Sequence, residues 1–296
     1  SISGTVTAIT DVLHISGRNM QSVVIENDGL EEVSDSVCPP TVENREQFLQ
    51  AVRNSGSIGL GGAGFPTSLK LGFDPKEKQP DFLIINGAEC EPYITSDYRC
   101  FMEDGEDVLE GVLLMLKYLG IPKCIIGIEK KKPKAIEKMT RLCEKHDNIT
   151  VKPLKSSYPQ GAEKTLIFST TGRVVKEGTL PLASGCIVVN SSTVAFIAQY
   201  IRTSMPLVKR RITVDGNIVK KPSNFIVPVG MSIGEIVYYA ELSDKPDRII
   251  LGGPMMGACA FDPDYPLSKT NNAVVMFADS PVYEPSEFIR CGKCVK

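Results

Sequence analysis

A glycine-rich segment is the part of this sequence with the clearest capacity for chemistry. Residues 59–65 read GLGGAGF, which places four glycines within six positions, and Lys70 follows shortly after. Glycine loses more conformational entropy on folding than any other residue, so a cluster indicates backbone that takes a positive φ or approaches another group closely. A tight loop would explain the cluster. A cofactor cradle would also explain it, because bare backbone N–H groups at a helix N-terminus bind phosphate, with Phe65 adding a ring and Lys70 a charge.

The segment is not a clear dinucleotide fingerprint. Gly59, Gly61 and Gly64 have the spacing G-x-G-x-x-G, but that fingerprint follows a β-strand. The residues before the segment instead predict a helix that Thr41 caps and Gly56 ends.

A second candidate site lies in residues 85–99, INGAECEPYITSDYR. It begins at the carboxyl end of the apolar run DFLIIN, and ligands of open α/β sheets bind at that end. Asn86 could hydrogen-bond a planar heterocycle, and Glu89 and Glu91 could accept hydrogen bonds from ribose hydroxyls or an amide. A solvated loop would carry the same charges. Cys90 could be a nucleophile, but no base is evident for it, and a small buried residue is the simpler interpretation.

The composition excludes several classes of protein. The chain has 296 residues and is 42% hydrophobic, which suffices for two or three domains. Its formal net charge is −2 and its densest basic run is EKKKPK, at residues 129–134, so a nucleic-acid footprint is not indicated. Its apolar stretches are far shorter than the roughly 18 residues that suggest a membrane span. The presence of only two histidines excludes a multi-histidine metal site and argues against a Ser/His triad.

Cysteine usage and the first residues indicate a reducing compartment. Nine cysteines, an odd number, are scattered along a chain that is too large to need disulfide bonds. The opening SISGTVTAI has neither a charged n-region nor an apolar h-region, so we expect no secretory signal peptide. The missing initiator methionine suggests a trimmed chain.

Hydrophobic patterns along the chain predict an α/β fold. Residues 1–37 alternate as short strands before the break CPP. From residue 81 to residue 203, buried-strand runs alternate with amphipathic helices, which favours a parallel sheet covered by helices. A strand, a DGN turn and a second strand then precede a helix capped by Ser232 and a further strand, an arrangement like a β-grasp unit. Residues 263–290 are interpreted as connecting or edge structure.

Four motifs, in this order along the chain, resemble those of a known family. They closely resemble motifs of RnfC, a component of the Rnf ferredoxin:NAD oxidoreductases, and read GLGGAGFPTSLK, INGAECEPY, YPQGAEK and GGPMMG. The flavin domain of RnfC is similar to the flavoprotein subunit of respiratory complex I. The resemblance covers essentially the whole chain. It implies a peripheral subunit on the cytoplasmic, inner face of the cell membrane. That subunit would exchange a hydride between NAD(H) and FMN, pass electrons through 4Fe–4S clusters and contact other subunits of a membrane complex.

Two other functions remain open. A soluble RnfC-like NADH dehydrogenase would deliver the same electrons to a cobalamin site or to an amino-acid reductase such as a proline reductase. A non-catalytic scaffold or binding module would leave the flavin pocket empty, although the glycine loop, Lys70 and the two glutamates argue against it.

The resemblance also implies how the chain is divided. A Rossmann-like domain for FMN and NADH would be flanked by a small barrel-sandwich domain and a β-grasp domain. The implied parts are a partial barrel-sandwich (biotinyl-like) domain at 1–40, the Rossmann-like domain at 41–204, the β-grasp domain at 205–262, and a connector with the start of a truncated ferredoxin-like region at 263–296.

Cofactor-binding residues follow from the same resemblance. The glycine loop would wrap FMN with Lys70 near the flavin or its phosphate, while Phe65 would stack on the nicotinamide nucleotide and Asn86 would contact the isoalloxazine edge. An acidic pair, a second loop and the segment VNSSTV at the ribityl phosphate would complete the site. The implied residues are Gly59, Gly61, Gly62, Ala63, Phe65, Lys70, Asn86, Glu89, Glu91, Tyr158, Gly161, Glu163, Asn190, Ser191 and Thr193. Ser191 and Ala162 depart from the family pattern, which has a valine and a second glycine there. Hydride transfer demands no general acid or base, so no catalytic residue is assigned.

Two cysteines near the end resemble part of a cluster site. Cys291 and Cys294 form CGKC, which is similar to the start of the family's 4Fe–4S segments. By itself a lone C-x-x-C fits a zinc or redox site equally well. Because the sequence ends at Lys296, before the other ligands of such segments, we expect that no cluster assembles properly on this polypeptide.

Overall fold

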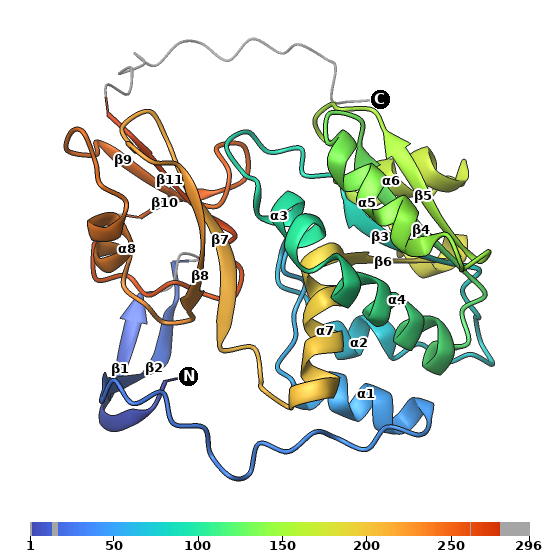
Figure 1. Cartoon of the computed structure of the whole chain (residues 1–296), viewed down its shortest axis with the longest axis horizontal. Coiled ribbons are helices and arrows are strands. Elements are labelled where there is room, and N and C mark those ends of the chain that lie inside the picture. Colours follow the sequence, from blue (N-terminus) through green and yellow to red (C-terminus); the bar gives the residue numbers. More distant parts are fainter. Residues whose placement is uncertain (1, 14–16, 261, 279–296) are drawn as a thin grey trace.

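A four-stranded parallel sheet forms the centre of residues 45–203 in the computed structural model, which describes residues 2–13, 17–260 and 262–278 (Figure 1). Its strands are β3 (Phe82–Gly87), β4 (Lys123–Glu129), β5 (Ile149–Leu154) and β6 (Cys186–Asn190). Their order is β5-β4-β3-β6, and every neighbouring pair is parallel, as the alternation of strands and helices predicts. We call residues 45–203 the parallel-sheet region.

Helices cover both faces of this sheet because its strands carry apolar side chains on both sides. They are α1 (Arg45–Asn54), α2 (Thr67–Leu71), α3 (Ser96–Glu103), α4 (Gly105–Leu119), α5 (Pro133–Cys143), α6 (Glu163–Thr171) and α7 (Ser191–Thr203). Leu83 and Ile85 of β3 pack in one core with α4, α5 and α7. Ile84 points to the other face and packs with α6.

The start of α1 differs from the sequence prediction. Asn44, not Thr41, is its N-cap, because the Asn44 Oδ1 accepts a hydrogen bond from the backbone N–H of Gln47 at 2.9 Å. Both residue types cap helices well, so sequence alone does not separate them. Gly56 follows the end of α1 with a φ of 66°, which fits its predicted place as a stop. The short helix α3 was not predicted.

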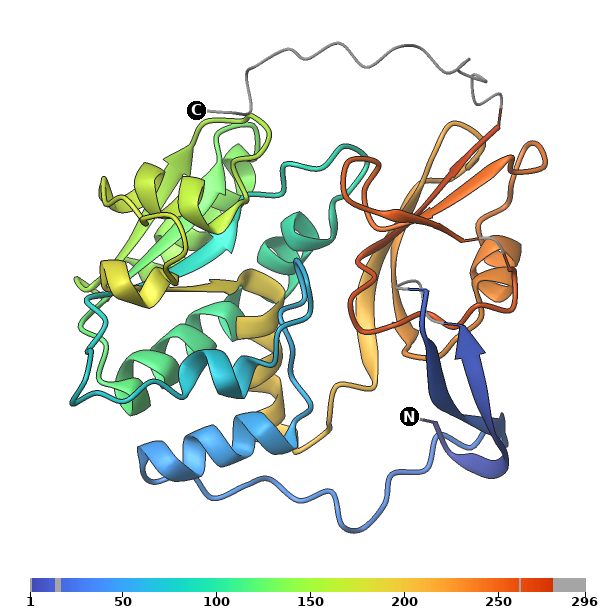
Figure 2. The same cartoon turned by 180° about the vertical axis from the view of Figure 1, so that it is seen from behind.

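A second, five-stranded sheet lies beside the parallel-sheet region (Figures 1 and 2). Its strands are β7 (Lys209–Asp215), β8 (Ser223–Pro228), β9 (Arg248–Leu251), β10 (Ala258–Ala260) and β11 (Ala273–Phe277). The order is β10-β9-β11-β7-β8, with β11 parallel to β7 and the other pairs antiparallel. Helix α8 (Ile233–Tyr239) packs on it, and Ser232 forms a capping box with Glu235, so the predicted cap is confirmed. We call residues 209–277 the mixed-sheet region.

The place of β11 corrects the interpretation of residues 263–290 as connecting or edge structure. This strand lies in the middle of the sheet, and its Ala273 to Met276 are fully buried. Five apolar residues suffice for a central strand that is buried on both faces. Before it, Pro263 and Asp264 lie in a turn, and Pro266 forms an isolated bridge with Ser232. Cys291 and Cys294 lie outside the described residues.

An antiparallel hairpin of β1 (Gly4–Leu13) and β2 (Asn19–Asn27) precedes both regions and lies on the side of the mixed-sheet region (Figures 1 and 2). Six of its large apolar side chains are 43% to 64% exposed, namely Val6, Ile9, Leu13, Met20, Val23 and Val24. Two strands alone are marginally stable in water. Within the described ranges, no helix has the length and apolar character needed to cross a bilayer.

Candidate functional site

The glycine loop is fastened to the start of α7. The backbone N–H of Leu60 donates to the Thr193 hydroxyl at 3.0 Å, and that hydroxyl donates to the carbonyl of Ile58 at 3.1 Å. Gly61 lies so close to Asn190 that a Cβ at this position would overlap its side-chain amide. At Gly62, apart from its chain neighbours, no atom of the described residues lies within 4 Å of the place a Cβ would take. One glycine is therefore required by packing inside the protein, and the next one faces open space.

Asn190 joins the start of α7 to α3. Its Oδ1 accepts hydrogen bonds from the backbone N–H groups of Ser192 and Thr193, at 2.9 and 3.4 Å, and so caps the helix. Its Nδ2 donates to the Asp97 carboxylate at 2.8 Å, and the Ser192 hydroxyl donates to the other Asp97 oxygen at 2.8 Å. Ser191 is fully buried beside them. Asn190 and Thr193, both expected at a phosphate, thus use their side-chain groups to hold the loop and the helix.

Lys70 links α2 to the far side of the site. Its ammonium group forms an ion pair with Glu163, at 2.5 Å, and donates to the carbonyl of Val188 in β6 at 3.1 Å. Glu163 is the first residue of α6. Both side chains remain 30% to 40% exposed, so each still has a polar face toward solvent or a ligand.

Asn86 fixes the loop before α6 against the end of β3. Its amide donates to the carbonyl of Gly161 at 2.9 Å, and its Oδ1 accepts from the backbone N–H of Ala88 at 3.1 Å. A Cβ at Gly161 would lie 2.6 Å from the Ala88 carbonyl, so only glycine permits this approach. Tyr158, in the same loop, leaves 44% of its surface exposed.

The two glutamates after β3 have different surroundings. Glu89 is 8% exposed and accepts a hydrogen bond from the Asp97 N–H, at the start of α3, at 2.8 Å. Lys132 lies 3.3 Å from its carboxylate. Burial, reinforced by the charge of Asp97, raises the pKa of Glu89 to about 7, against the opposing charge of Lys132. Glu89 is therefore a buried group that titrates near neutrality.

This pKa predicts a pH-dependent stability. A carboxyl whose pKa rises from 4.5 to about 7 on folding contributes stability below pH 4.5 and loses it as the pH rises through 7. We expect Glu89 to lower the free energy of unfolding by about 3 kcal/mol between those limits, and Glu89→Gln to remove this part of the slope. Urea unfolding at pH 5.5 and pH 8 covers the upper part of this range, in which about 2 kcal/mol of the loss should fall. The exposed Glu106→Gln should keep the wild-type slope, and an unchanged slope in Glu89→Gln would contradict the assignment.

Glu91 contacts the mixed-sheet region. Its Oε2 accepts a hydrogen bond from the backbone N–H of Met255 at 3.0 Å, in the loop GGPMMG between β9 and β10. A Cβ at Gly253 would overlap the Glu91 carboxylate, which explains a glycine there. The other oxygen, Oε1, is buried and has no hydrogen-bond partner among the described residues. The motif GGPMMG thus reaches the acidic pair through a main-chain contact.

Most of the predicted residues gather at the carboxyl end of the parallel sheet. Asn190 ends β6 and pairs with Asn86, the penultimate residue of the neighbouring strand β3. The glycine loop, the two glutamates and the loop before α6 border this pair. Phe65 lies at the margin and is 52% exposed. Sequence reasoning missed Asp97, Lys132 and Arg210. Asp97 stands in the segment INGAECEPYITSDYR without a distinguishing spacing, and the other two come from distant segments.

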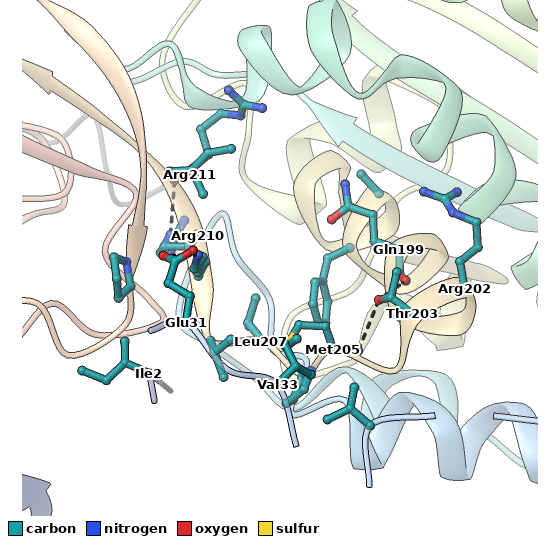
Figure 3. A pocket seen from close by; sticks show the side chains of 18 of the residues that line it. Ile2, Glu31, Val33, Gln199, Arg202, Thr203, Met205, Leu207, Arg210 and Arg211 are labelled. Carbon is teal, nitrogen blue, oxygen red and sulfur yellow. Dashed lines mark hydrogen bonds and ion pairs between the residues drawn. The ribbon is translucent and has the colours of Figure 1, made fainter. Parts of the chain in front are cut away.

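A separate cavity lies between the N-terminal segment, α7 and strands β7 and β8 (Figure 3). Its volume is about 900 Å³. In Figure 3, Gln199 and Arg202 of α7 lie on one side, and Arg210 and Arg211 lie on the other. None of the residues predicted to bind flavin or nucleotide lines it. Leu60 does, so the cavity and the candidate site share the glycine loop.

Comparisons with known proteins agree with this geometry. Residues 52–199 match the family described as the Nuo51 FMN-binding domain. The chain is 38% identical over 301 residues to the component designated C of the Na(+)-translocating ferredoxin:NAD(+) oxidoreductase complex of Acetobacterium woodii, and the match covers 100% of this chain and 68% of that protein. It is 34% identical over 289 residues to the component designated C of the ion-translocating oxidoreductase complex of Rhodobacter capsulatus. That match covers 96% of this chain and 56% of the Rhodobacter capsulatus protein. The chain therefore spans about two thirds of the first relative and little more than half of the second.

A solved structure has a similar fold. The crystal structure of an NAD+-reducing NiFe-hydrogenase in the H2-reduced state superposes with a TM-score of 0.67 at 22% identity. The superposition covers 79% of this chain and 47% of the hydrogenase chain. It supports the α/β fold with a parallel sheet.

Proposed function

The chain belongs to the RnfC family, whose members are components of ion-translocating ferredoxin:NAD(+) oxidoreductase complexes, and from this premise we propose that it exchanges a hydride between NAD(H) and FMN. FMN would supply the chemistry, since a flavin accepts two electrons as a hydride and releases them singly. The observation that carries the proposal is the glycine loop, in which Gly61 is packed against Asn190 while Gly62 faces open space. Such a loop lets a planar cofactor approach the backbone closely.

The chain's own part would be to hold and orient the flavin. Gly61 and Gly62 give close access to the backbone, and Lys70 offers a cation whose present partner, Glu163, is itself part of the site. Asn86 keeps the loop that contains Gly161 in place at the end of β3. We assign this group of residues to FMN.

The nicotinamide nucleotide would bind beside the flavin. Phe65 and Tyr158 have half-exposed rings at the margin of the site, and aromatic rings of this kind stack on planar heterocycles. Glu91 has a buried carboxylate oxygen with no partner in the described part of the chain, which suits a donor from a ribose or an amide. We assign these three residues to NAD(H), and Glu89 to the positioning of the loop between them.

The wider architecture and partners are proposals on the same premise. We propose that the hairpin is part of a barrel-sandwich domain and that the mixed-sheet region is a β-grasp domain. Cys291 and Cys294, outside the described residues, would begin a cluster-binding segment. Electrons would pass from FMN through 4Fe–4S clusters to other subunits of a membrane complex, with this protein peripheral on the inner face of the membrane.

An anaerobic titration tests the proposal. FMN is added to the purified chain, binding is followed by quenching of flavin fluorescence, and NADH is then added while flavin absorbance is recorded. We expect saturable binding of FMN and bleaching by NADH. Lys70→Glu should weaken FMN binding at least roughly tenfold, because it places two carboxylates together where a cation stood.

Lys164→Glu is the matched control, since Lys164 is an exposed lysine of the same neighbourhood whose ammonium group, among the described residues, hydrogen-bonds only the Lys176 carbonyl. It should bind FMN like the wild type. A folded chain that binds no FMN would contradict the proposal and favour a scaffold. Binding without bleaching would contradict the assignment of NADH as the electron donor.

A further inference from the structure

Arg210 reaches from the mixed-sheet region into the glycine loop. It stands in β7 and is 6% exposed. Its Nη2 donates to the carbonyl of Leu60 at 3.1 Å, its Nη1 donates to the carbonyl of Lys269, and its Nε donates to the carbonyl of Arg211 at 3.3 Å. Figure 3 shows Arg210 beside Arg211 in the wall of the cavity, with the last of these bonds dashed. All three acceptors are neutral main-chain oxygens.

The charge of this guanidinium is balanced at a distance. No carboxylate of the described residues lies within ion-pair distance of Arg210. Burial lowers its pKa to about 10, and the opposing effect comes from Asp97. Asp97 is partly buried, and its desolvation raises its pKa, while hydrogen bonds from Ser192 and Asn190 and the positive charge of Arg210 counteract the rise. Each of these two opposite charges therefore reduces the free-energy cost of desolvating the other.

The Leu60 peptide is held from both regions of the molecule. Its N–H donates to Thr193 of α7, in the parallel-sheet region, and its carbonyl accepts from Arg210 of β7, in the mixed-sheet region. The two peptide planes on either side of Leu60 are thereby each held by one hydrogen bond. Asp97, which balances Arg210, holds Asn190 and Ser192 at the start of α7.

We propose that Arg210 is a positioning residue of the FMN site. Through its hydrogen bond to the Leu60 carbonyl, Arg210 would fix the glycine loop relative to the mixed-sheet region, and through its charge interaction with Asp97 it would stabilise the start of α7. The proposal rests on the proposed function in that the cofactor is FMN. Substitution of Arg210 would leave the Leu60 carbonyl without its hydrogen-bond donor and Asp97 without its countercharge. The glycine loop and the start of α7 should therefore both become less stable.

Arg211 supplies a matched control. It is the next residue of β7 and also joins the two regions, through ion pairs with Glu103 and with Asp104 at 2.9 Å. Its donor atoms do not contact the glycine loop. Substitution of Arg211 therefore weakens the contact between the two regions without removing a hydrogen bond to Leu60. Comparison with this variant shows whether Arg210 positions the glycine loop or only connects the two regions.

The experiment compares Arg210→Lys, Arg210→Gln and Arg211→Gln in the complete chain. Hydrogen exchange of the peptide that contains Leu60 is measured without FMN, and FMN affinity is measured by fluorescence quenching. We expect both Arg210 variants to exchange faster at this peptide and to bind FMN at least roughly tenfold more weakly. Arg210→Lys should retain wild-type circular dichroism. Arg211→Gln should keep the wild-type exchange at this peptide and the wild-type affinity for FMN.

A double variant tests the electrostatic part. Adding Asp97→Asn to Arg210→Gln removes the uncompensated carboxylate, so it should restore part of the stability lost in the single variant. Equal effects of the Arg210 and Arg211 substitutions on exchange at Leu60 and on FMN affinity would overturn the proposal. They would show that Arg210 only connects the two regions of the molecule. A wild-type chain that binds no FMN would refute the proposed function, whereas the exchange measurement would still decide whether Arg210 positions the loop.

Discussion

Gly61→Ala is expected to destabilise the chain by about 1–3 kcal/mol and to abolish tight binding of FMN. An added Cβ would overlap the side-chain amide of Asn190. Asn190 cannot retreat without releasing the N–H groups of Ser192 and Thr193 that it caps and the Asp97 carboxylate that it contacts. Urea unfolding of the chain without cofactor gives the first effect, and titration with FMN gives the second.

The neighbouring Gly62→Ala is the matched control for packing. In the part of the chain that the structure describes, no atom beyond its chain neighbours lies within 4 Å of the place its Cβ would take, so the free energy of unfolding should change by less than about 0.5 kcal/mol. If FMN approaches the loop there, the same methyl group should weaken FMN binding while the fold is unchanged. Equal stabilities of the two variants would show that the loop is not packed on Asn190 as described.

Gly111→Ala should also destabilise the chain, although alanine has a higher helix propensity than glycine. Alanine in the middle of a helix is normally favoured over glycine by about 1 kcal/mol. Gly111 of α4, however, faces α7 so closely that a Cβ would overlap the carbonyl of Val194. The helices must move apart, and we expect a net loss of about 1–3 kcal/mol. Because α7 begins at the proposed FMN site, affinity for FMN should fall as well.

Thermal and urea unfolding of Gly111→Ala measure the loss. Glu106→Ala, on the exposed side of α4, serves as the control and should change stability by no more than about 0.5 kcal/mol. A Gly111→Ala chain that is more stable than the wild type would mean that α4 and α7 are not in direct main-chain contact.

Local patterns were sufficient to predict the parallel sheet. Runs such as CIIGI and CIVVN are apolar on both faces, as strands between two helical layers must be, and Gly120 and Ser232 mark helix ends through their own backbone and side-chain chemistry. The run AVVMF has the same character, yet prolines and aspartates before it led to its interpretation as connecting structure. Its partners, β7 and β9, are set by pairing across the chain, which local patterns do not record.

The candidate site was predicted where its residues carry motifs and missed where they act through distant partners. Asn86 and the glycine loop could be named because glycine clusters and strand ends have a local signature. Arg210 could not, because its acceptor Leu60 lies 150 residues earlier in the chain. Asp97 meets Asn190 across 93 residues, and burial alone determines how much these charges matter. Neither distance nor burial can be read from a single sequence.

The central position of β11 sets an order of events while the protein is being made. β11 pairs with β7 along Ala273 to Val275, about sixty residues after its partner strand, so the five-stranded sheet cannot close until that last strand has left the ribosome. Domains generally fold from the N-terminal end during synthesis, which lets the parallel-sheet region form first. The hydrogen bond from Arg210 to the Leu60 carbonyl can then form only after the mixed sheet that contains β7 has folded. We therefore expect the glycine loop to reach its final geometry, and to bind FMN as proposed, only after residue 277 has emerged from the ribosome.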